Sequence, residues 1–179
     1  DFVMIRLGSR GYDSGVVELD DNFEANLTNA LAAGIDVGIY FHSQAVTVEE
    51  AAEEGAYVAA QLVGKEIAYP VVFEMEEIIN DSARTDHLNQ NSRTDIVKTF
   101  LSTVQAAGYT PMIYGNKQWL IEQIELDELV GYDVWLAQPG DLPDYPYGFQ
   151  MWQYAMDGKI NGIADRVDFT ISFVDYAAR

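Results

Sequence analysis

The chain has 179 residues, of which 49% are hydrophobic, a length and composition typical of one globular domain with its own core. Its 29 acidic and 10 basic residues give a formal net charge of −19, which argues against nucleic acid or an anionic membrane as the ligand. It has no cysteine, and no apolar run approaches the roughly 18 residues of a membrane helix. The sequence therefore excludes a disulfide framework and thiolate metal sites and predicts no membrane insertion.

Strand and helix signals alternate from the first residue to about residue 131. Apolar runs predict strands at residues 2–7, 36–41, 69–76 and 111–115. Capping residues followed by helical spacing predict helices that run from Asp21 to Gly34, Thr47 to Gly64, Ser92 to Gly108 and Asn116 to Gly131. This alternation indicates an α/β fold with a parallel sheet.

The pattern changes in the last third of the chain. Residues 133–138, 149–154 and 166–171 predict three more strands with no helix-length segment between them. Segments 32–40 and 106–114 also share one layout, in which a helix ends in Ala-Ala-Gly and a strand ends in Tyr. These features predict a TIM-like barrel that lacks its last helices, with seven strands where a closed barrel has eight.

The segment Tyr69-Pro-Val-Val-Phe-Glu-Met-Glu76 is an apolar strand that ends in two carboxylates. Side chains two residues apart on a strand share a face, so we expect Glu74 and Glu76 to lie roughly 7 Å apart on one side. Mutual repulsion would raise one pKa and leave a proton donor beside a charged group, which suits acid catalysis on a glycosidic oxygen. The alternative, that both acids only cap the polar loop at residues 77–91, carries equal weight on this segment alone.

Three other kinds of residue are candidates for a site. Arg6 is unusual in an apolar strand, and we interpret it as a buried salt-bridge partner for a central acid in preference to a substrate contact. His42 and His87 are the only histidines, and we interpret a lone histidine at a strand end as structural. With no cysteine and no second histidine nearby, we predict no catalytic metal and no cofactor.

Several segments together carry a family resemblance. They are the Ile-Arg-x-Gly strand at 5–8, Asp21-Asn-Phe-Glu-Ala-Asn26, residues 33–40, residues 70–76, Trp135-Leu-Ala, Met151-Trp-Gln-Tyr154 and the glycine-rich stretch 158–163 that leads to Val167-Asp168. In this order and spacing the chain resembles the glycoside hydrolase family 25 lysozymes, which are N-acetylmuramidases. The resemblance covers essentially the whole chain.

The resemblance implies a flattened (β/α)5(β)3 barrel that cleaves the β-1,4 bond between N-acetylmuramic acid and N-acetylglucosamine in peptidoglycan. Glu76 falls on the position of the family's general acid. Glu74 falls where the family usually has an aspartate that orients the reacting N-acetyl group, and Asp168 falls on its late aspartate. The resemblance also implies retention of stereochemistry with help from the substrate's own acetamido group.

Two departures from the family pattern bear on activity. The family begins with a strand that carries an Asp-x-Ser motif, and nothing precedes Asp1 in this sequence. We therefore expect that strand and its helix to be absent, which leaves an open barrel with two exposed strand edges. Glu at 74 in place of aspartate adds one methylene, and a displacement of roughly 1 Å costs about a hundredfold in rate.

The leading hypothesis is a single catalytic domain, residues 1–179, that hydrolyses peptidoglycan glycan strands as a monomer outside the cell or at the cell wall. Tyr40, Tyr114 and Trp135 are predicted to offer aromatic faces to the sugars, and Gln153 to bind an N-acetyl group. Trp152 is predicted to lie in the core. Two alternatives stay open: a glycan-binding barrel with little or no catalysis, and a glycosidase for another N-acetylated glycan such as chitin.

Overall fold

The computed structural model describes residues 1–76 and 83–178. Its strands are β1 (Phe2–Arg10), β2 (Val17–Leu19), β3 (Asp36–His42), β4 (Val71–Glu74), β5 (Pro111–Asn116), β6 (Asp133–Ala137), β7 (Met151–Gly158) and β8 (Val167–Ser172). Its helices are α1 (Phe23–Ala32), α2 (Val48–Leu62), α3 (Gln90–Ala106) and α4 (Lys117–Glu122), with 3-10 turns η1 (Arg84–His87) and η2 (Leu126–Leu129).

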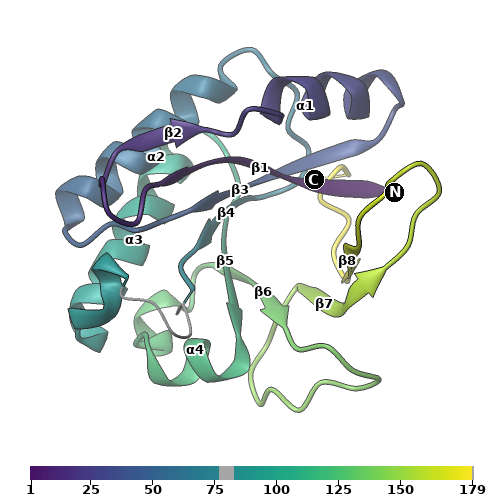
Figure 1. Cartoon of the computed structure of the whole chain (residues 1–179). Coiled ribbons are helices and arrows are strands. Elements are labelled where there is room, and N and C mark those ends of the chain that lie inside the picture. The colour runs from purple at the N-terminus through teal and green to yellow at the C-terminus, as the bar shows by residue number, and fades with distance from the viewer. Residues whose placement is uncertain (77–82, 179) are drawn as a thin grey trace.

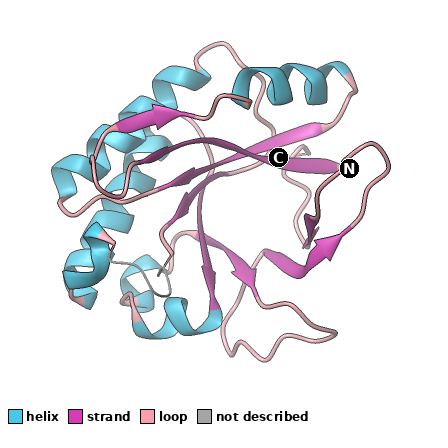
Figure 2. Ribbon diagram, in the orientation of Figure 1, coloured by secondary structure: helices cyan, strands magenta, loops and turns pink. Residues whose placement is uncertain are grey.

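The eight strands form one curled, open sheet in the order β2-β1-β3-β4-β5-β6-β7-β8 (Figure 1). Strands β1 and β3 to β7 run parallel to one another, and β2 and β8 are antiparallel edge strands. Figure 2 shows the helices gathered around one part of the sheet, whereas loops alone connect β6, β7 and β8. This arrangement confirms the predicted α/β class and all seven predicted strands.

Strand β4 shows why the central strands are apolar throughout. Val71 and Phe73 pack into the large cluster beneath the helices, whereas Val72 packs into a second cluster on the inner face of the curled sheet. Both faces are covered, as expected for a buried parallel strand. Glu74 follows Val72 by two residues, so its side chain emerges on the inner face.

The helix boundaries follow local signals with some corrections. Thr47 and Asn116 accept hydrogen bonds from the backbone N–H of Glu50 and Trp119, as their predicted N-cap roles require. Helix α3 begins at Gln90 behind the cap Asn89, two residues before the predicted Ser92.

The predicted caps were wrong in two further places. Helix α1 has Asn22 rather than Asp21 as its N-cap, and that cap makes no side-chain hydrogen bond. Helix α4 ends at Glu122, because the chain turns into η2 before it reaches Gly131.

Strand β2 was not predicted. Three residues are too few to show a period of two, and the pairing depends on the absence of a side chain at Gly8 of β1. A Cβ atom at Gly8 would lie 2.2 Å from the carbonyl oxygen of Glu18, so only glycine lets the two strands pair here.

The predicted polar loop and the predicted absence of a membrane helix can be compared with the structure only over the described residues. Of the predicted polar loop at 77–91, residues 77–82 lie outside the described residues, and residues 84–87 form η1. Within residues 1–76 and 83–178, no helix is long and apolar enough to cross a membrane.

Candidate active site

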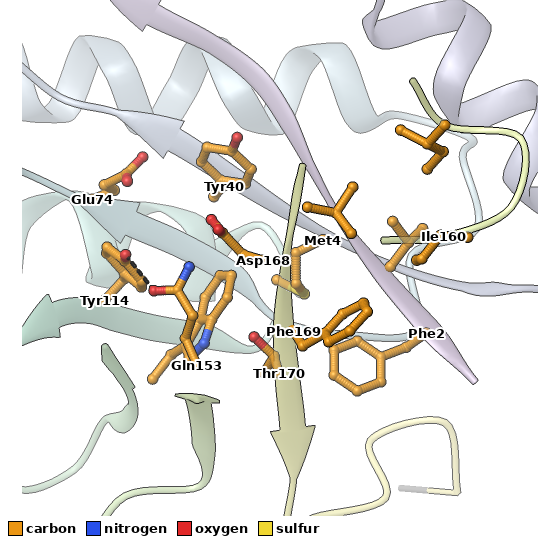
Figure 3. Close-up of a pocket in the computed structure, with 14 residues that line it drawn as sticks. Phe2, Met4, Tyr40, Glu74, Tyr114, Gln153, Ile160, Asp168, Phe169 and Thr170 are labelled. Atoms are coloured by element: carbon orange, nitrogen blue, oxygen red, sulfur yellow. Dashed lines mark hydrogen bonds between the residues drawn. The ribbon is translucent and has the colours of Figure 1, made fainter. Parts of the chain in front are cut away.

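A cavity of about 410 Å³ opens on the inner face of the sheet (Figure 3). Six of the eight predicted site residues line it: Tyr40, Glu74, Tyr114, Trp135, Gln153 and Asp168. Figure 3 shows Tyr40, Glu74, Tyr114, Gln153 and Asp168 grouped at one side, with the apolar side chains of Phe2, Met4, Ile160 and Phe169 at the other. The polar side of the cavity is therefore built from β3, β4, β5, β7 and β8, and Trp135 of β6 lines the cavity as well.

Asp168 of β8 is held beside the end of β4. Desolvation by the cavity walls raises the pKa of Asp168, and the negative charge of Glu74 raises it further. A hydrogen bond from the side chain of Gln153 acts in the opposite direction because it favours the ionised form. Asp168 is thus tied to both Gln153 and Glu74.

Glu76 lies just past the end of β4 and has an exposed side chain, whereas Met75 before it is buried. It lines a smaller cavity of about 180 Å³ with Arg93, Trp119 and other residues, and not the larger one. Surrounding protein desolvates its carboxyl and raises its pKa, and the charge of Glu74 raises that pKa further. This is the electrostatic condition that a general acid needs.

The hydroxyl of Tyr114 is influenced by the charges of all three carboxylates. Its buried hydroxyl donates a 2.8 Å hydrogen bond to Oε1 of Gln153. Desolvation raises the pKa of Tyr114, and the charges of Glu76, Glu74 and Asp168 each raise it further. The negative charges of all three acids therefore raise the pKa of the same hydroxyl, although the acids line two different cavities.

Gln153, which is predicted to bind an N-acetyl group, lines the cavity. Gln153 is only 2% exposed, its oxygen accepts a hydrogen bond from Tyr114, and its side chain favours the ionised form of Asp168. The amide is therefore engaged within the wall of the cavity.

The aromatic candidates lie in that wall as well. Trp135 meets Tyr114 edge to face with ring centroids 4.9 Å apart, and each is 7% exposed. Tyr40 is only partly buried. Desolvation and the charge of Glu74 raise the pKa of Tyr40 to about 12. Trp152 packs in the large cluster beneath the helices, which confirms its predicted place in the core.

Arg6 does form a salt bridge, but its expected burial and partner were wrong. Its guanidinium donates to Asp20 through Nε at 2.7 Å, and its side chain is 53% exposed. Strand β2 pairs with β1, and the backbone N–H of Asp20, just after β2, donates to the carbonyl oxygen of Leu7, which brings the Asp20 carboxylate beside Arg6. Arg6 does not line the cavity that holds Glu74.

His42 was interpreted as structural, yet it lies beside Glu74. Its Nδ1 is 3.5 Å from Oε2 of Glu74, because the two residues are register partners at the ends of β3 and β4. One sequence signal was available: His42 and Glu74 both end predicted neighbouring parallel strands. In the described part of the chain, no group of three His, Cys, Asp or Glu side chains is placed to hold a metal ion.

Replacing Tyr114 with Phe is expected to lower the free energy of unfolding by about 1–3 kcal/mol, because the buried Oε1 of Gln153 loses its donor. Urea unfolding of the variant measures this. The half-buried Tyr109 provides a matched Tyr→Phe control with an expected change near zero. Equal losses in the two variants would show that the Tyr114 hydrogen bond contributes no net stability.

Comparison with known proteins assigns the chain to a family. The model of the glycosyl hydrolases family 25 matches residues 13–163, which is most of the chain. The chain belongs to glycosyl hydrolase family 25. A search of curated proteins found no match.

Solved structures show the same fold. The CTP1L endolysin is 22% identical with a TM-score of 0.77, and the match covers 98% of this chain and 60% of that one. The autolysin LytC from Streptococcus pneumoniae is 22% identical with a TM-score of 0.80, covering 95% and 40%. The bacterial lysozyme from Streptomyces coelicolor is 20% identical with a TM-score of 0.67, covering 99% and 83%. This family 25 chain thus spans 60% and 40% of the lengths of the first two.

Proposed function

We propose that residues 1–179 form one catalytic domain that hydrolyses the β-1,4 bond between N-acetylmuramic acid and N-acetylglucosamine in peptidoglycan. The observation that carries this proposal is that Glu74 and Asp168 line one cavity with Tyr114, and that Glu76 follows Glu74 by two residues with its pKa raised by desolvation and by the charge of Glu74. Membership of glycosyl hydrolase family 25 supports a glycosidic bond as the target.

In the proposed reaction the exposed carboxyl of Glu76 donates its proton to the glycosidic oxygen as the C1–O bond breaks. The carbonyl oxygen of the substrate's acetamido group forms the new bond to C1. Glu74 and Asp168, as carboxylates, orient the acetamido group and stabilise the positive charge that develops. Water then attacks C1, reopens the acetamido ring and returns a proton to Glu76, which gives net retention.

Two structural neighbours support glycan strands as the partner. LytC was solved with a synthetic peptidoglycan ligand, and the Cpl-1 endolysin with a peptidoglycan analogue. We place this domain at the cell wall or outside the cell for the same reason, acting as a monomer without a metal or cofactor. Tyr40 and the edges of Tyr114 and Trp135 would contact the sugars from the cavity wall.

Release of reducing ends from purified peptidoglycan tests the proposal. We expect new N-acetylmuramic acid reducing ends, and little or no release from chitin oligomers. Release from chitin alone would favour a different N-acetylated substrate. Binding to peptidoglycan with no release would favour the glycan-binding barrel, an alternative that the glutamate at 74 motivates.

The raised pKa of Glu76 predicts the direction of the pH dependence. Glu76 must hold its proton to act as an acid, so activity is expected to fall as pH rises through its raised pKa. Glu74→Gln removes a negative charge that raises this pKa, and Glu76 then loses its proton at a lower pH. A carboxyl carbon NMR titration measures the midpoint directly, without relying on activity.

The exposed Glu66 supplies the matched control for that titration. Glu66→Gln changes the net charge by the same amount and should leave the Glu76 midpoint where it is. A Glu76 midpoint that stays fixed or moves upward in Glu74→Gln would contradict the proposed coupling of the two acids.

A further inference from the structure

His42 contacts Glu74 at a point where neither side chain is well solvated. The side chains of His42 and Glu74 are 17% and 15% exposed, and Nδ1 lies 3.5 Å from Oε2. This distance is long for a hydrogen bond, but hydrogen bonds in unliganded active sites are often long and tighten when the substrate binds. His42, at the end of β3, therefore restrains the side of the Glu74 carboxylate that faces it.

Tyr12 fixes the other side of the imidazole. Its hydroxyl lies 3.3 Å from Nε2 of His42, and the two ring centroids are 5.9 Å apart. A neutral ring with its proton on Nδ1 donates to Glu74 and accepts from Tyr12. The other tautomer would turn a lone pair toward the carboxylate. The two neighbours therefore select the tautomer that binds Glu74.

The turn that carries Tyr12 is fastened by a buried ion pair. It lies in the turn between β1 and β2, and Arg10 donates to the carbonyl oxygen of Gly15 in that turn at 2.7 Å. Arg10 also donates to Glu54 of α2 at 2.7 Å, and these two side chains are 4% and 0% exposed. The turn is thus fastened to α2, which gives Tyr12 a defined place.

We propose that His42, oriented by Tyr12, is a positioning residue that holds the Glu74 carboxylate for catalysis. This inference rests on the proposed hydrolase function. It also gives a role to the longer side chain at position 74: glutamate has one more rotatable bond than the aspartate expected there, and the histidine contact limits that added freedom. A misplaced carboxylate costs about a hundredfold in rate for an error near 1 Å.

The kinetic test compares two substitutions at His42. His42→Phe keeps the ring but removes both nitrogens, and we expect kcat to fall by about ten- to a hundredfold with little change in KM or melting temperature. His42→Asn places an amide nitrogen near the position of Nδ1 and should restore most of the lost rate. A His42→Phe variant with the wild-type kcat, or an Asn variant no better than Phe, would overturn the proposal.

Tyr12→Phe tests the second contact. We expect a smaller loss of kcat than in His42→Phe, and no added loss when the two substitutions are combined, because both act through one ring. Additive losses would contradict the proposed order of action. His87→Phe, at the exposed second histidine, serves as the control and should keep the wild-type rate.

A measurement independent of activity separates the inference from the proposed function. Imidazole ¹⁵N shifts report the tautomer, and His87→Asn leaves His42 as the only histidine signal. We expect the neutral ring to carry its proton on Nδ1, and a proton on Nε2 would overturn the contact. If the wild-type domain released no reducing ends, the proposed function would be wrong. The ¹⁵N measurement of the tautomer would still test whether His42 donates to Glu74.

Discussion

Glu76→Gln is expected to lower the rate of reducing-end release from peptidoglycan by about 10²- to 10⁴-fold, the usual contribution of a general acid. Glutamine has the size of the protonated acid but holds no proton that it can transfer. The exposed position of Glu76 means that the fold and the binding of glycan should be retained. Steady-state release assays together with calorimetric binding to a soluble peptidoglycan fragment measure both quantities.

The outcome distinguishes the two main hypotheses for this chain. Glu66→Gln, at another exposed glutamate, should keep the wild-type rate and so controls for the change in charge. Hydrolysis that persists unchanged in Glu76→Gln would remove Glu76 from the mechanism. A wild-type domain that binds peptidoglycan as tightly as the variant, with equally little release, would support a glycan-binding barrel.

Arg10→Met is expected to cost about 3–5 kcal/mol of unfolding free energy, the usual result of removing one partner from a buried ion pair. Arg10 donates to Glu54 at 2.7 Å and to Glu53 at 2.8 Å. Without Arg10, the Glu54 carboxylate would stay fully buried. Among the residues that the structure describes, the hydroxyl of Ser43, at 2.6 Å, would be the one side chain left to stabilise its charge. Urea unfolding, extrapolated to water, gives the free energy.

Strand β1 supplies a control for this effect of burial. Arg6→Met also breaks an arginine–carboxylate pair, but the Arg6 side chain is 53% exposed, and an exposed pair contributes only about 0–1 kcal/mol. Equal losses in the two variants would show that the buried network does not stabilise the fold as proposed. A double variant with Arg10→Met and Glu54→Leu should recover part of the loss, because the uncompensated charge is removed with its partner.

The sequence determined the elements whose signals are local. The apolar run of β4, the caps Thr47 and Asn116, and the change from strand–helix units to bare strands all predicted what the structure contains, whereas Glu76, predicted on the same strand as Glu74, lies past its end. Each signal arises within a few residues, because a cap or a two-residue period is a property of neighbouring positions. The same local signals, in their order along the chain, carried the family resemblance, which the family model confirms.

The tertiary structure alone decided which side chains meet. Arg6 pairs with Asp20, Gln153 joins Tyr114 to Asp168, and His42 contacts Glu74. These contacts depend on strand register and on how closely the backbones of two strands approach each other. At Gly8, for example, the absence of a side chain lets β2 pair with β1. Sequence spacing carries no record of such distances, because contacts between strands form only when the whole sheet is assembled.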